Sequence, residues 1–176
     1  MSSTPSNSHP APGSRPSTEP SLPPNQDLVL LFTALHAACD AEVVRRIGAD
    51  GFGDLRPAHG YVFQHLVPGP VTISELARKL GMTAQGASKL VIELEGFGYV
   101  ARQTDPADRR NHTVSLTARG WSAIEAGRAA RAAVTAQLRE ALGEDAADAL
   151  VTSLQRLAER TGGLRTLLAR RLRPGL

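Results

Sequence analysis

This sequence of 176 residues has little cysteine and no long apolar run. Its single cysteine, Cys39, excludes an internal disulfide and any cysteine-built zinc finger. The longest obvious apolar run, Leu28–Phe32, is far too short to cross a bilayer. The chain does not open with a basic segment followed by an apolar core, so we expect no secretory signal, no membrane partner and a cytoplasmic location.

Catalytic motifs are missing as well. The sequence contains no G-x-S-x-G elbow, no phosphate-cradling glycine loop followed by lysine, and no paired carboxylates in an evident cleft pattern. It also lacks HxxxH, CxxC and HExxH spacings, and His59 and His65, six residues apart, cannot share one helix face well. We therefore expect no enzyme, no cofactor and no metal ion.

His36 and Cys39 are a pair whose spacing leaves metal or thiol chemistry open. Three residues apart on one helix, they could be two metal ligands, a nucleophile with its base, or a redox sensor. The simpler interpretation is a small apolar cysteine packed in the helix beside a histidine, which is the commoner arrangement. The sequence favours packing and keeps a metal-sensing regulator as an alternative.

Length and charge set loose bounds on the function. A chain of 176 residues suits one domain with a substantial core. The net charge is +3 and the sequence pI is near 9.6, which permits nucleic-acid binding without requiring it. Almost all basic residues are arginine, whose guanidinium can pair bidentately with guanine or phosphate.

The chain divides at about residue 25. Residues 1–24 are dominated by serine and proline and bury too little apolar surface to offset the entropy of ordering, so we expect a disordered tail. Residues 25–176 form the predicted domain. Its first helix spans about 25–47, with Asn25 or Asp27 as the cap.

A loop and a second helix follow. The glycine-rich stretch 48–54 predicts a loop. Pro57 suits the first turn of a helix that runs through Leu66, and the sequence Pro-Gly-Pro at 68–70 ends it.

Residues 72–120 carry the pattern on which the functional interpretation depends. Thr72 stands three residues before Glu75, so its hydroxyl can cap a helix while the carboxylate returns to the cap. Four apolar residues then recur on one helix face, namely Ile73, Leu76, Ala77 and Leu80. Gly81 follows at once, where a left-handed glycine commonly ends a helix, and predicts a tight turn.

A further helix begins beyond that turn, with Thr83 as its cap and Met82 before it. Its apolar face consists of Ala87, Leu90, Val91 and Leu94. Its outward face consists of Ala84, Gln85, Ser88, Lys89 and Ile92. A helix that enters a major groove needs such small, hydrogen-bonding and cationic side chains. Taken alone, the same face would also suit an ordinary solvated helix.

Two β-like runs complete the pattern. Residues 99–104 and 112–116 read as strands, the second with clear alternation of polar and apolar side chains. Between them, residues 105–111 have turn chemistry and present two adjacent arginines at a hairpin tip. An arginine there can enter a minor groove. The predicted fold class is mainly α with a small β-hairpin wing, a winged helix-turn-helix.

The run from EL-(x)2-KLGM-T through GYV-x-R, DPADRR and LT-(x)2-G resembles the winged helix-turn-helix of the MarR (multiple antibiotic resistance regulator) family of bacterial transcription factors. The resemblance covers about residues 55–120, and the helical flanks match more loosely. Its most specific part is Asp108-Arg109-Arg110, six residues before Leu116-Thr117.

The resemblance implies a sequence-specific regulator of transcription, of the repressor type, that binds double-stranded DNA as a homodimer on a pseudo-palindromic operator. The DNA-contacting residues that it implies are Thr83, Gln85, Ser88, Lys89 and Arg110. Ala84 on the same outward face and Arg109 at the hairpin tip are predicted to contact DNA as well. Arg110 would reach the minor groove, and Asp108 would help to hold it. Gly86 departs from the pattern, because glycine inside a helix costs about 1 kcal/mol against alanine. We interpret it as clearance for DNA or a neighbouring helix.

The terminal helices, about 25–47 and 117–172, carry more apolar surface than a small winged domain needs to cover. The last one has a heptad seam made of Leu150, Leu154, Leu157, Thr161, Leu164 and Leu168. This seam could pack within its own chain or against a second copy, and the resemblance, whose members pair through terminal helices, favours the homodimer. Gly162-Gly163 predicts a bend or fraying.

The resemblance also implies a small aromatic effector, bound where the dimerisation helices meet the winged helix-turn-helix of residues 55–117. The lining candidates by position are Phe32, His36, His59, Phe63 and Trp121, each of which is also accounted for as hydrophobic core. A metal-sensing regulator of the same fold and a dimeric interaction module that does not bind DNA remain alternatives. Gln85, Lys89, Arg109 and Arg110 argue against the module, which has no reason to keep them together.

Overall fold

The computed structural model describes residues 23, 25–104 and 112–169. The chain divides into two compact units, Met1–Ala37 and Ala38–Leu176. The predicted tail falls outside the described residues except for Pro23. Within the described part, no helix combines the length and the apolar character that crossing a membrane requires.

The first helix, α1 (Leu28–Ile47), begins in the first unit and ends in the second. Asp27 caps it, since its Oδ1 accepts hydrogen bonds from the backbone N–H groups of Val29 and Leu30 at 2.9 and 3.2 Å. No residue of α1 is buried, and the apolar side chains of its first half are exposed, including Leu28, Leu31, Phe32 and Leu35.

The stretch after α1 differs from the predicted loop. It contains a single π-helical turn, η1 (Gly48–Phe52), in which Gly51 has a φ of 90°. Glycine adopts this left-handed conformation without Cβ strain. The glycine-rich composition therefore marked the place where the backbone changes direction, but the prediction of a loop was wrong for these residues.

The second α-helix, α2 (Pro57–Leu66), has the predicted bounds. Proline stands at its first position, where the missing N–H has no partner to lose. Arg56 precedes it in an extended conformation and shares a reciprocal cap with His59.

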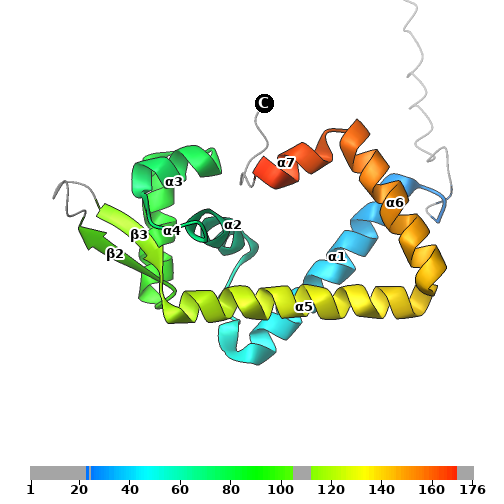
Figure 1. The fold of residues 1–176 in the computed structure, drawn as a ribbon, viewed down its shortest axis with the longest axis horizontal. Coiled ribbons are helices and arrows are strands. Elements are labelled where there is room, and N and C mark those ends of the chain that lie inside the picture. Colours follow the sequence, from blue (N-terminus) through cyan, green and yellow to red (C-terminus); the bar gives the residue numbers. More distant parts are fainter. Residues whose placement is uncertain (1–22, 24, 105–111, 170–176) are drawn as a thin grey trace, which may run out of the picture. The chain divides into compact units, whose positions relative to one another are not determined.

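The helix-turn-helix consists of α3 (Ile73–Leu80) and α4 (Ala84–Gly96). A three-stranded antiparallel sheet lies with them, made of β1 (Val71–Thr72), β2 (Val100–Thr104) and β3 (His112–Leu116) in the order β1-β3-β2. The β2–β3 hairpin extends beside α4 (Figure 1). The predicted wing is therefore present, and β1 is an additional strand.

Strand β1 is too short to be predicted from the sequence. Val71 and Thr72 pair with Val114 and Thr113 of β3, and two residues are too few to show the alternation that identifies a strand. Through this pairing, the segment that enters α3 is joined to the wing.

The core of the winged unit, residues 55–117, forms where the predicted apolar faces of α3 and α4 meet α2 and the sheet. Its fully buried side chains include Val62, Leu66, Leu76, Leu80, Val91, Leu94, Tyr99 and Val114. Burying one leucine or valine side chain of this kind contributes about 1.5–3 kcal/mol. This core fixes which face of α4 remains at the surface.

Within residues 118–169, three helices follow the sheet, namely α5 (Ala118–Leu142), α6 (Glu144–Arg160) and α7 (Gly163–Ala169). Gly143, with a φ of 79°, separates the first two, and Gly162, with a φ of 74°, separates the last two. The predicted interruption of the heptad seam is thus confirmed as a helix end.

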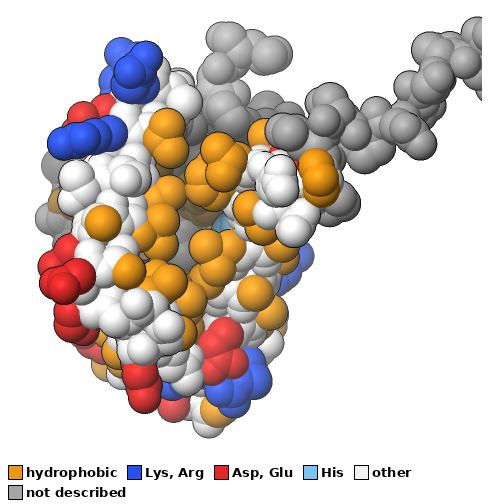
Figure 2. All heavy atoms as spheres, turned by 90° about the vertical axis from the view of Figure 1, so that its right-hand side faces the viewer, with side chains coloured by type: hydrophobic (Ala, Val, Ile, Leu, Met, Phe, Trp, Pro, Cys, Tyr) orange, Lys and Arg blue, Asp and Glu red, His pale blue; other side chains and the backbone are white. Residues whose placement is uncertain are grey.

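The surface of α6 is rich in exposed apolar side chains. Leu150, Val151, Leu154 and Leu157 are each at least 36% exposed, and Ala147 is the buried residue of the helix. Figure 2 shows hydrophobic side chains gathered on the face where α6 lies. Exposed apolar surface of this extent is typical of sites that bind another surface.

Candidate nucleic-acid interface

The entry to α3 and the turn after it are fixed by local hydrogen bonds. The hydroxyl of Thr72 accepts from the backbone N–H of Glu75 at 3.2 Å, as the sequence predicts. Gly81 adopts the left-handed conformation with a φ of 67°, and the N–H of Met82 donates to the carbonyl of Ala77 at 3.0 Å. These bonds satisfy backbone groups at both ends of α3 and hold the turn short.

The start of α4 is fixed in the same way. The hydroxyl of Thr83 accepts from the backbone N–H of Gly86 at 3.1 Å. A Cβ at Gly86 would lie 2.9 Å from Cε of Met82 and 3.3 Å from the Thr83 hydroxyl oxygen. The clearance that Gly86 provides therefore serves the turn and cap of its own motif, whereas the sequence suggested DNA or a neighbouring helix.

The outward face of α4 carries the candidate DNA-reading side chains. Thr83, Ala84, Gln85 and Lys89 are exposed, and Ser88 is half-buried. The opposite face is buried in the core through Ala87, Val91 and Leu94. The fold therefore presents the predicted residues together on one surface, and Ile92, 52% exposed, continues it.

Two cations near this surface are available to a ligand. Arg78 of α3 and Lys89 of α4 are both exposed, and neither forms an ion pair within the described residues. The other lysine of the motif, Lys79, pairs with Glu75 at 3.1 Å. The sequence alone does not single out Arg78, because it looks there like one more solvated charge.

Two carboxylates attach α4 to its neighbours. Glu93 pairs with Arg56, which precedes α2. Glu95 pairs with Arg102 of β2 through both the guanidinium and the backbone N–H. Neither pair can be predicted from the sequence, because partners 37 and 7 residues apart belong to different elements and leave no periodic signal.

A second group of contacts joins η1, the start of β2 and α5. The hydroxyl of Tyr99 donates to Oδ1 of Asp54 at 2.5 Å, and Arg119 donates to the same hydroxyl at 3.1 Å. The Arg119 guanidinium also lies 4.7 Å from the centroid of the Tyr99 ring and 5.5 Å from that of Phe52. Burial, followed by the bond to Asp54, raises the pKa of Tyr99. This group fixes the direction in which α5 leaves the winged unit.

The candidate wing residues Asp108, Arg109 and Arg110 lie outside the described residues. The strands that carry this segment are described up to Thr104 and from His112, which pair with each other in β2 and β3. The position of the wing arginines at a hairpin tip thus remains a prediction.

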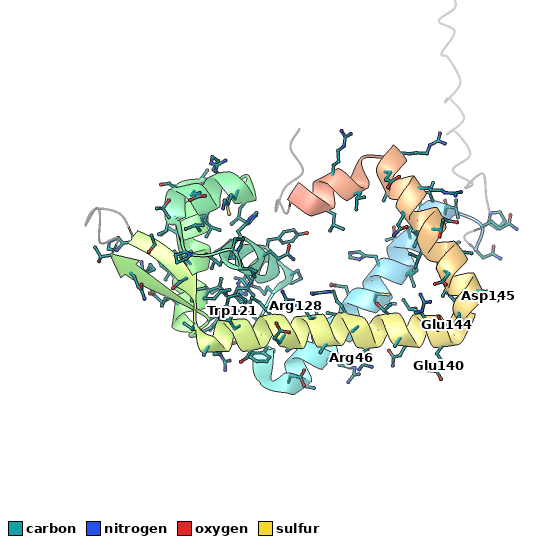
Figure 3. The ribbon with its side chains drawn as sticks, in the orientation of Figure 1. Arg46, Trp121, Arg128, Glu140, Glu144 and Asp145 are labelled. Atoms are coloured by element: carbon teal, nitrogen blue, oxygen red, sulfur yellow. The ribbon has the colours of Figure 1, made fainter. Side chains whose placement is uncertain are left out.

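The five effector candidates do not form one described site. His59 and Phe63 are buried in the core of the winged unit, and Trp121 near the start of α5 is 42% exposed (Figure 3). Phe32 and His36 are exposed on α1 within the first unit. Cys39 is half-buried. Across residues 25–104 and 112–169, no cluster of three or more His, Cys, Asp or Glu side chains could hold a metal ion.

His59 has a structural environment that its sequence context does not reveal. Its Nδ1 accepts from the backbone N–H of Arg56 at 3.2 Å, and its Nε2 lies 3.6 Å from Glu93. Burial lowers the pKa of His59 from its ordinary 6.5, although the Glu93 carboxylate opposes that shift. The neutral ring is therefore the form that this cap requires.

Stability should fall because of His59 over the pH window that opens below 6.5. With a lowered folded-state pKa, the unfolded chain binds the proton more readily, so stability is complete above 6.5 and declines as the pH falls. Urea unfolding of the wild type and of His59→Gln at several pH values measures this. The variant should show a shallower decline over that window, and parallel curves would contradict the assignment. Glu42 and Glu95, whose pKa values lie below 4.5, do not titrate there.

Comparison with known proteins agrees with this geometry. A model of the MarR family matches residues 54–111. The uncharacterized HTH-type transcriptional regulator YcgE of Bacillus subtilis is 49% identical over 51 residues, which are 28% of this chain and 33% of that protein. The matched part thus spans about a third of the length of this curated relative.

Solved structures extend the similarity beyond the winged unit. The YusO protein of Bacillus subtilis has a TM-score of 0.67 at 25% identity, covering 77% of this chain and 94% of that one. The transcriptional repressor CouR, solved bound to a 23-mer DNA duplex, has a TM-score of 0.57 at 26% identity, covering 76% and 94%.

Proposed function

Because this chain belongs to the MarR family of transcriptional regulators, we propose that it is a homodimeric repressor that binds a pseudo-palindromic operator. Each protomer places α4 in a major groove, and Arg110 of the wing enters the flanking minor groove. With two-fold pairing, the two recognition helices lie about 34–36 Å apart, one turn of the duplex. The structure of CouR with a DNA duplex supports this use of the fold.

The observation that carries the proposal is the surface of α4. Its buried face is fixed by Ala87, Val91 and Leu94, so Gln85 and Lys89 are held at the surface of a rigid helix. A glutamine can pair bidentately with adenine, and a lysine can bind guanine or phosphate. Helix α3 adds Arg78 as a candidate phosphate contact, since the first helix of such a motif crosses the DNA backbone.

Homodimerisation is proposed from the exposed apolar side chains of the terminal helices. Within the first unit, Leu28, Leu31, Phe32 and Leu35 of α1 are each at least 42% exposed. Within the second, α6 exposes its leucines in the same way. A monomer would leave both surfaces in water, whereas pairing with a second copy buries them.

Release by a small aromatic effector is a further part of the proposal. Trp121 supports it, because an indole 42% exposed beside the winged unit can stack on an aromatic ligand. Such a ligand could regulate DNA binding only by favouring one spacing of the two recognition helices over another.

Arg110→Ala should weaken binding to the operator about tenfold and reduce the salt slope by about 1, since it removes one cation from the minor groove. Fluorescence anisotropy with a labelled duplex recovered by selection, at several salt concentrations, measures both quantities. Arg128→Ala, which removes an exposed arginine of α5 (Figure 3), is the matched control and should bind like the wild type. Superimposable titrations of Arg110→Ala and wild type would show that the wing does not contact DNA.

A further inference from the structure

The contact between Glu95 and Arg102 joins the two elements that read DNA in the proposed function. Glu95 lies in the last turn of α4, and Arg102 is the middle residue of β2. Arg102 Nε donates to Oε2 of Glu95 at 2.8 Å, and its Nη2 lies 2.5 Å from the same oxygen. The other oxygen, Oε1, accepts from the backbone N–H of Arg102 at 3.3 Å. The carboxylate thus holds both the side chain and the main chain of the strand.

The backbone contact follows from the place of β2 in the sheet. With the order β1-β3-β2, β2 is an edge strand and has one row of backbone groups without a strand partner. Arg102 pairs in register with Val114 of β3, yet its N–H points away from β3 to the Glu95 carboxylate. Glu95 therefore takes the place of a missing neighbouring strand at the centre of the wing.

The electrostatics of the pair agree with a persistent contact. The Arg102 hydrogen bond lowers the pKa of Glu95 below its ordinary 4.5, and the Glu95 hydrogen bond raises the pKa of Arg102. Both side chains remain partly exposed, at 32% and 39%. An ion pair this exposed contributes little to the stability of a fold by itself, so we expect the pair to act mainly by fixing the geometry of the wing.

We propose that Glu95 is a positioning residue that clamps the wing to the recognition helix through Arg102 and so places the wing arginine at the minor groove. This inference rests on the proposed function, because it needs a wing that contacts DNA. Arg102 lies two residues before Thr104, the last residue of β2, and Arg110 follows six residues later in the sequence.

The direction in which one substitution changes DNA affinity distinguishes a positioning role from a purely electrostatic one. Glu95 is an anion beside the proposed DNA surface, so its removal by electrostatics alone would tighten binding to a polyanion. Loss of the clamp would weaken binding instead. Glu95→Ala should lower operator affinity about tenfold, within the range of coupling between neighbouring contacts. Glu95→Gln keeps an acceptor for the Arg102 N–H, so its operator affinity should lie between those of the wild type and Glu95→Ala.

The decisive experiment is a double-mutant cycle with Arg110→Ala. If Glu95 acts by placing Arg110, the tenfold loss from Glu95→Ala should shrink to less than about twofold when Arg110 is already alanine. Anisotropy titrations with the selected duplex give the four affinities, and thermal unfolding confirms that each variant is folded. Glu125→Ala removes an exposed acid of α5 as the matched control and should leave affinity unchanged.

Each outcome decides the proposal. Unchanged or tighter binding by Glu95→Ala, or an equal loss in both backgrounds, overturns the clamp while leaving the proposed function intact. A wild-type protein that binds no duplex, or an Arg110→Ala variant that binds like the wild type, overturns the clamp together with the proposed use of the wing. A loss that disappears in the Arg110→Ala background supports it.

Discussion

Replacing Gln85 and Lys89 together by alanine is expected to lower the affinity for the operator by at least about 100-fold and to remove most of the preference for it. Both side chains are exposed on α4, whose opposite face is locked in the core. A good bidentate contact to a base contributes about 1–3 kcal/mol of discrimination, and a phosphate or guanine contact by lysine adds to it. Anisotropy titrations with the operator and with a shuffled duplex measure affinity and preference separately.

The matched control removes the same kinds of side chain from another helix. Gln137→Ala with Arg128→Ala deletes an exposed glutamine and an exposed cation from α5. That double variant should bind the operator like the wild type. If the two double variants lose affinity equally, or if the α4 variant keeps its preference for the operator, α4 is not the element that reads bases.

Gly120→Ala is expected to reduce the stability of the fold by about 3 kcal/mol or more. A Cβ at this position would lie 2.2 Å from the carbonyl oxygen of Tyr99 and 3.0 Å from Cδ2 of Leu116. The carbonyl cannot move aside easily, because it accepts from the backbone N–H and hydroxyl of Thr117, both at 3.0 Å. Urea unfolding of the purified variant measures the loss.

Gly60→Ala is the comparison for that experiment. Gly60 lies inside α2 with no atom within 4 Å of a new Cβ, and its φ is not positive. Alanine there should leave the urea midpoint unchanged or raise it, by up to about 1 kcal/mol of stability. Equal midpoints for the two variants would contradict the close approach between α5 and the start of β2.

The helix-turn-helix was predictable because its determinants are local. Thr72, Gly81 and Thr83 act on backbone groups within three to five residues, so their roles can be read from spacing alone. The apolar faces of α3 and α4 follow from periodicity in the same way. The interruption at Gly162 was predictable for the same reason.

Elements without a local signal escaped prediction. Strand β1 is two residues long, and its existence depends on pairing with Val114, more than forty positions later. The π-helical turn at Gly48–Phe52 has a composition that also suits a loop. Strand β2 begins at Val100, one residue after the predicted start, because the N–H of Tyr99 donates to the carbonyl of Leu94 at the end of α4.

The residues of the candidate site also differ in whether a local sequence signal reveals them. Residues that face outward on one helix, such as Gln85 and Lys89, are found by periodicity. Glu95 and Arg102 depend on how β2 lies against α4, and an acid followed by an arginine has no meaning in sequence until that packing is known. His59 was proposed as an effector contact, and its hydrogen bond to Arg56 supports a capping role that no spacing rule predicted.

The most direct test of the account is selection of bound fragments from genomic DNA with the purified full-length chain, at moderate salt. Two copies of α4 related by two-fold symmetry should enrich a pseudo-palindrome whose half-sites lie about 10 base pairs apart, or a multiple of that spacing. Recovery of fragments without a shared motif, or retention of every duplex to the same extent, would contradict the claim that this protein reads DNA through α4 and its wing.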